Sequence, residues 1–112
     1  MIEKIVLDYL SERFTEPVYM EEPEAKPETY VLIEKTGSGE TNHIGSATIA
    51  VQSYAPSLYE AAALSERVKT AMKNAITMDE IVKVTLNSDY NYTNTASKRY
   101  RYQAVFDVIF YD

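Results

Sequence analysis

His43 is the first candidate for chemistry, because it is the only histidine in a chain of 112 residues that contains no cysteine. A histidine can act as a general base or bind a metal, but both tasks require partner side chains. No second histidine, no thiolate and no nucleophile pair accompanies His43, which lies in a polar segment with two glycines. We therefore expect a solvated loop residue, and no catalytic, metal or cofactor site.

Carboxylates gather in residues 16–29, where Glu21, Glu22 and Glu24 are interleaved with prolines. Oxygen ligands of this kind suit a hard cation such as Ca²⁺. The spacing lacks the alternating acids, the central glycine and the late glutamate of a calcium-binding loop. We interpret the segment as a solvated acidic connection, since prolines at this density exclude a helix and a central strand.

The run Gly37-Ser38-Gly39 has the glycines of a phosphate-binding loop. It follows an expected strand, but neither a Lys-Ser/Thr pair nor a helix comes after it. A hairpin tip is the better interpretation.

Cations alternate with aromatic side chains in residues 98–102 (KRYRY). This pattern is found in platforms that bind single-stranded nucleic acid. The alternative is a strand whose tyrosines are half-buried and whose Arg99 and Arg101 pair with acids on a neighbouring strand. The net charge of −6 favours the alternative and argues against a general nucleic-acid binder. No stretch approaches the roughly 20 apolar residues of a membrane span.

The apolar pattern predicts one α+β domain over residues 1–112 with the order α-β-β-β-α-β-β. The expected elements are a helix over 2–14, an edge strand at 18–20, strands over 30–35 and 46–54 joined by a long mobile loop at 36–43, a helix over 57–75, and strands over 81–90 and 99–111. Hairpin-like connections imply a mainly antiparallel sheet of four to five strands with two helices packed on one face.

The second helix has the strongest local signals. Ser57 and Glu60 fit a capping box at its start. Its buried stripe is expected to consist of Ala61, Leu64, Ser65, Val68, Ala71, Met72 and Ala75. In the next strand we expect Val82, Val84, Leu86 and Tyr90 to share one face.

Tyrosine is unusually common, with ten residues, and it is a residue type that is enriched at protein interfaces. The last strand would span roughly 40 Å if its thirteen residues are extended, against a usual strand of about five or six residues. Either a bulge breaks this strand, or a neighbouring subunit covers its end.

Several segments of the chain carry a family resemblance. They are 30–35 (YVLIEK), the loop with Gly37 and Gly39, 47–55 (ATIAVQSYA), 57–62 (SLYEAA), 86–93 (LNSDYNYT) and 100–107 (YRYQAVFD). In these segments the chain resembles the tail terminator, or tail completion, proteins of long-tailed bacteriophages and prophages of Gram-positive bacteria. The resemblance covers about three-quarters of the chain and begins at Tyr30.

The resemblance implies a structural virion protein without catalytic residues. Such proteins assemble as a hexameric ring on the head-proximal end of the tail tube, stop tube polymerisation and present a surface to the head-tail connector proteins. The expected location is the virion, after assembly in the bacterial host cytoplasm, with no membrane and no sequence-specific nucleic acid as partner. The alternatives are a head-tail joining or neck protein of the same architecture, and a small enzyme or nucleic-acid-binding module.

A ring needs a heterologous interface, in which one surface patch meets a different patch on the next copy. The residues we expect at protein interfaces are Gly37, Gly39, Thr41, Asn42, His43, Arg99, Arg101 and Tyr111. The net charge leads us to expect acidic side chains on the inner wall, where they would repel the passing genome. The candidates are Glu21, Glu22, Glu24 and Glu66. Alternatively, the charge is spread outward for solubility.

Overall fold

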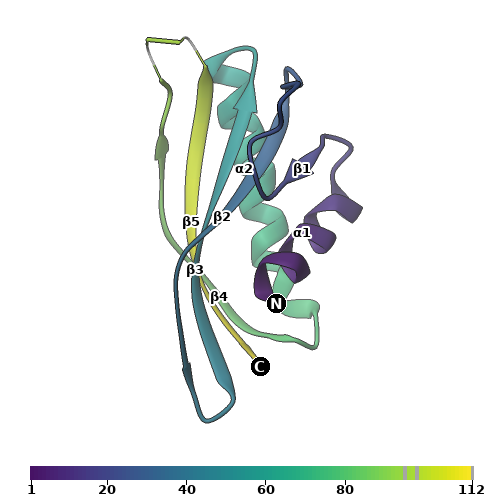
Figure 1. Cartoon of the computed structure of the whole chain (residues 1–112), viewed down its shortest axis with the longest axis vertical. Helices are drawn as coiled ribbons and strands as arrows, with labels where there is room; N and C mark the ends of the chain where they lie inside the picture. The colour runs from purple at the N-terminus through teal and green to yellow at the C-terminus, as the bar shows by residue number, and fades with distance from the viewer. Residues whose placement is uncertain (95, 98, 112) are drawn as a thin grey trace.

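Two helices lie against one face of a five-stranded sheet in the computed structural model, which describes residues 1–94, 96–97 and 99–111 (Figure 1). In chain order the elements are α1 (Ile2–Arg13), β1 (Val18–Tyr19), β2 (Tyr30–Thr41), β3 (Ile44–Ala55), α2 (Leu58–Asn74), the 3₁₀ turn η1 (Ala75–Thr77), β4 (Ile81–Asn91) and β5 (Tyr100–Tyr111). The strands lie in the order β1-β2-β3-β5-β4, and each neighbouring pair is antiparallel except β1 with β2. The α+β class and the order of elements are confirmed.

The main core lies between the helices and the sheet face toward them, which we call the inner face. Val6 and Leu10 of α1 pack there with residues of α2, β2, β3 and β5. The predicted stripe of α2 is confirmed, since all seven of its residues are buried. Burial of each large apolar side chain contributes roughly 1.5–3 kcal/mol, so the helices are held mainly by this packing.

Helix α2 begins as its capping signal predicts. The Ser57 side-chain oxygen accepts a hydrogen bond from the backbone N–H of Glu60 at 3.2 Å, and Ser57 Oγ donates to the Glu60 carboxylate at 2.9 Å. The cap fixes the switch from β3 to helix within three residues, and it places α2 across β3 and β5.

The predicted loop at 36–43 is wrong. Strand β2 continues to Thr41 and β3 begins at Ile44, so only Asn42 and His43 form the turn. Both have positive φ, 52° and 66°, as a tight two-residue hairpin turn requires, and both residue types tolerate this conformation. The glycines and small polar residues therefore sit in an exposed strand, with a bulge between Lys35 and Gly37. Figure 1 shows the hairpin extending past the start of α1.

The expected shared face of β4 is also wrong. Val84 and Leu86 pack against the core as expected, but a register shift between Leu86 and Ser88 reverses the alternation. Tyr90 consequently pairs with Gln103 on the opposite side of the sheet, which we call the open face. A second shift between Ile81 and Lys83 leaves Val82 exposed. Strand β5 itself pairs with β3 over twelve positions without a shift, so the bulges lie in its neighbour.

Candidate functional site

The predicted interface residues fall at two ends of the sheet. At the hairpin end lie Gly37, Gly39, Thr41, Asn42 and His43, all exposed, together with Tyr111, which pairs with Ile44. Arg101 pairs with Tyr54 at the other end. Arg101 and Tyr111 are ten positions apart along β5, which corresponds to about 33 Å. The eight residues therefore form two surfaces.

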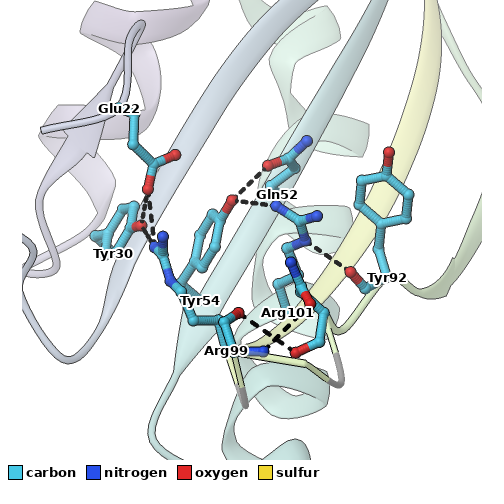
Figure 2. Close-up of polar contacts among 9 residues, drawn as sticks. Glu22, Tyr30, Gln52, Tyr54, Tyr92, Arg99 and Arg101 are labelled. Carbon is cyan, nitrogen blue, oxygen red and sulfur yellow. Dashed lines mark hydrogen bonds and ion pairs between the residues drawn. The ribbon is translucent and has the colours of Figure 1, made fainter.

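A row of aromatic and guanidinium groups crosses the open face at the second end (Figure 2). Tyr30 of β2 pairs with Tyr54 of β3, and Tyr54 pairs with Arg101 of β5. The Tyr30 and Tyr54 rings are stacked with centroids 4.4 Å apart. Arg101 donates a hydrogen bond to the Tyr54 hydroxyl at 2.7 Å, and its guanidinium carbon lies 4.4 Å from the ring centroid of Tyr92. Such contacts stabilise an Arg side chain in a fixed orientation.

Glu22 joins this row from the connection between β1 and β2. The Tyr30 hydroxyl donates to Glu22 Oε1 at 2.6 Å, and Arg99 Nη2 donates to the same oxygen at 2.8 Å and to the Tyr30 hydroxyl. Burial favours the neutral carboxyl, but the two hydrogen bonds and the positive charges of Arg99 and Lys26 together outweigh it and hold the pKa of Glu22 below its ordinary value. Burial, together with the bond to Glu22, raises the pKa of Tyr30 far above its ordinary value. Tyr30 therefore stays a neutral donor.

A chain of neutral hydrogen bonds extends the site across the sheet. The Tyr54 hydroxyl donates to Gln52 Oε1 at 2.8 Å, and Gln52 Nε2 donates to Gln103 Oε1 at 2.9 Å. Gln103 Nε2 donates in turn to the Tyr90 hydroxyl. The stacked rings of Tyr30 and Tyr54 join this chain to the Glu22 contacts, and together they hold the surface from Glu22 to Tyr90 rigid.

The four acids expected on an inner wall are not brought together. Glu22 lies on the open face with Arg99, while Glu21 and Glu24 are exposed on the same connection. Glu66 lies on α2, on the other side of the sheet, where it pairs with Lys69 at 2.7 Å. At most three of the four can therefore line one surface of a subunit.

The interpretation of residues 98–102 needs a correction, although Lys98 lies outside the described residues. Arg99 pairs with an acid of the β1–β2 connection, and Arg101 is held by Tyr54 and Tyr92 instead of an acid on a neighbouring strand. The expected partners are wrong because β4 ends at Asn91, opposite Tyr102, and the residue that lies beside Arg101 is Tyr92, whose backbone N–H donates to Arg101 O. Tyr100 and Tyr102 are half-buried, as expected.

A groove of about 560 Å³ lies away from this site, beside the start of α1. Within residues 1–94, 96–97 and 99–111, no group of three or more His, Cys, Asp and Glu side chains is placed to hold a metal ion. His43 occupies its turn without a polar partner in that part of the chain.

Sequence reasoning missed the contact of Glu22 with Tyr30 and Arg99, which are separated by 8 and 77 positions. The pairing of Tyr30 with Tyr54 carried a signal. A two-residue turn at Asn42–His43 with one bulge places them opposite each other, but the assumed long loop left the register undefined.

The sequence matches no protein-family model and no curated protein at significant similarity. Across the described residues, neither α1 nor α2 has the length and apolar composition needed to cross a membrane.

Proposed function

We propose that this chain is a tail terminator of a long-tailed bacteriophage or prophage. It forms a ring, with six copies as the expected number, on the head-proximal end of the tail tube, stops tube polymerisation and provides the surface for the head-tail connector proteins. Its location is the virion, after assembly in the bacterial host cytoplasm.

One observation carries the proposal: the free outer edge of β2. Beyond Leu32 no described strand pairs with this edge, and the eight residues from Glu34 to Thr41 are all exposed. A long exposed edge is prone to pair with another chain, and proteins usually shorten, cover or charge such edges. A subunit that assembles by pairing its sheet edge with the next copy needs such an exposed strand edge.

The opposite edge of the sheet supports the same proposal. Strand β4 pairs only with β5 in the described chain and leaves its outer side free. Antiparallel pairing along β2-β3-β5-β4 makes β2 and β4 run in opposite directions. Copies rotated about an axis parallel to the strands would therefore meet as an antiparallel β4–β2 pair, which is the heterologous contact that closes a ring.

The direct test adds the purified protein to polymerising tail tube protein and measures tube length by electron microscopy. We expect tubes of limited length with a ring at one end, and a hexamer mass for the ring. Binding to capsids but not to tubes would support the neck protein instead. Neither ring nor binding to tubes or capsids would refute a role in tail assembly.

Two variants make the test specific to the β2 edge. A Cβ at Gly37 meets nothing within 4 Å, so Gly37→Lys should fold normally while placing a charged chain beside the free edge. Glu12→Gln, on the exposed side of α1, changes the net charge by the same amount. We expect only Gly37→Lys to lengthen the tubes.

A further inference from the structure

The groove beside the start of α1 has an apolar wall and one incompletely bonded carboxylate. Met1 and Ile5 line one side, and Phe110 lines the floor over Gly45. Glu3 also lines the groove, with Oε2 3.4 Å from Nζ of Lys35. Its Oε1 is buried and accepts no hydrogen bond from the described residues. The Glu3 carboxylate therefore keeps hydrogen-bonding capacity beyond its contact with Lys35, which a cation in the groove can use once the Glu3 side chain turns toward it.

An exposed corner with the complementary chemistry lies on the other flank of the molecule. Ile76 of η1 is 54% exposed and Val82 of β4 is 38% exposed. Lys73, three residues before Ile76, is exposed and makes no ion pair or hydrogen bond with the described residues. Lys69, one turn earlier on α2, reaches Asp89 of β4, which shows that this flank of α2 faces the β4 edge. We call Lys73, Ile76 and Val82 the η1–β4 corner.

Groove and corner lie at the same level of the sheet. One row of paired residues runs from Glu40 through Gly45 and Phe110 to Ile81. Gly45 and Phe110 form the floor of the groove, and Ile81 precedes Val82 of the corner. Phe110 of the groove contacts the core on the helix side of the sheet, and Lys73 and Ile76 of the corner belong to α2 and η1 on that side.

We propose that the groove of one copy holds the η1–β4 corner of a second copy, with the Lys73 ammonium on the Glu3 carboxylate. Ile76 and Val82 would pack against Met1 and Ile5, and the helical layer would continue from α1 to α2 of the neighbour. The proposal rests on the ring of the proposed function and names its contact. A second copy fits because the groove offers apolar surface with an acid, and the corner offers apolar surface with a cation.

Cysteine cross-linking tests the contact without background, since the natural chain has no cysteine. Glu3→Cys and Lys73→Cys proteins are mixed at the highest soluble concentration and oxidised. We expect a disulfide-linked dimer from the mixture and little from either protein alone, because the contact joins different patches. Lys4→Cys is the matched control, since Lys4 is adjacent to Glu3 but pairs with Asp8 on the outer side of α1.

Charge reversal provides a second measurement on proteins that keep their apolar contacts. Glu3→Lys and Lys73→Glu should each weaken self-association by about 10-fold in sedimentation, and the double variant should recover most of the loss. The cross-linking result would overturn the proposal if Lys4→Cys cross-links as well as Glu3→Cys, if Glu3→Cys pairs mainly with itself, or if no disulfide-linked dimer forms. The charge-reversal result would overturn it if the double variant does not recover self-association.

The outcome separates this inference from the proposed function. If the Glu3→Cys and Lys73→Cys proteins form the disulfide-linked dimer but the protein does not bind tail tubes, the contact is supported and the tail terminator proposal is refuted. If the protein caps tubes normally but no Glu3–Lys73 disulfide forms, the tail terminator proposal is supported and the contact is refuted.

Discussion

Replacing Glu22 by Gln removes the negative charge, but not the acceptor oxygen, with which the β1–β2 connection is tied to the open face. Glu22 accepts hydrogen bonds from the Tyr30 hydroxyl and from the Arg99 guanidinium. Bonds to a charged group contribute about 1.5–3 kcal/mol when buried. The Glu22 side chain is 38% exposed, and exposed ion pairs contribute only about 0.2–1 kcal/mol. We therefore expect Glu22→Gln to lower the free energy of unfolding by about 1 kcal/mol at pH 7.

The pH dependence of this loss has a defined sign. The folded state lowers the pKa of Glu22 below its ordinary value of 4.5, so folding favours the ionised carboxyl. The stabilisation is fully present above the unfolded pKa and disappears as pH falls through the folded pKa. The natural protein and the Glu22→Gln variant should therefore differ most near neutral pH and converge in acid.

Urea unfolding at several pH values measures both effects. With a slope of about 2 kcal/mol per molar urea, the midpoint of Glu22→Gln should fall by about 0.5 M at pH 7 with the slope unchanged. Glu21→Gln is the matched control, because Glu21 is exposed and the described residues offer it no ion pair or hydrogen bond. Equal midpoints for the two variants at neutral pH, or a difference that persists below the folded pKa, would refute the reasoning.

Three further changes test the sheet. His43→Gly should stabilise the fold by up to about 1 kcal/mol in thermal unfolding, because His43 has φ 66° and glycine adopts that conformation without a Cβ penalty. Gly45→Ala should lower the free energy of unfolding by about 1–3 kcal/mol, because the added Cβ would meet the Phe110 ring. Gly37→Ala has open space around its Cβ and should change the free energy of unfolding little. Similar losses at both glycines would contradict the packing. Ser53→Ala should be neutral or stabilising in urea unfolding, because the Ser53 hydroxyl is buried and has no hydrogen-bond partner among the described residues.

The helices and the inner face could be predicted because each has a local cause. The capping box and the apolar period act within one or two turns, and the structure places both helices where these signals put them. Strands β3 and β5 pair over twelve positions without a shift, so the inner-face residues of each follow from period two, although β3 is buried on both faces from Ile49 to Ala55.

The hairpin and the second half of β4 could not be predicted in the same way. A bulge adds one residue to a strand without a fixed sequence signature, and it reverses every side chain beyond it. This explains why Tyr90 lies on the open face although its spacing from Leu86 predicts the inner one. The turn at Asn42–His43 lacks the glycine that usually marks such turns, so the polar residues before it resembled a loop.

The open-face site could not be predicted, because it depends on the hairpin register, on the bulge in β4 and on a contact between residues that are distant in the sequence. Its rows form only when the hairpin register pairs Tyr30 with Tyr54 and when the bulge turns Tyr90 toward Gln103. Its acid comes from Glu22, in a segment whose sequence indicates only an exposed connection. Spacing along the chain predicts none of these pairings, because each is set by tertiary register.

The charges of this site bear on how a ring could let DNA pass. Free cations on an inner wall would bind phosphate by releasing counterions, so their absence matters more than an excess of acids. Arg99 is paired with Glu22, and Arg101 is fixed by Tyr54 and Tyr92. Glu66 lies on the helix side of the sheet, where it forms an ion pair with Lys69. Within the proposed function, an open face turned inward would therefore present one guanidinium neutralised by an acid, Arg99 with Glu22, while Arg101 keeps its positive charge because its partners are neutral. The net charge of −6 would then serve solubility more than repulsion of DNA at this site.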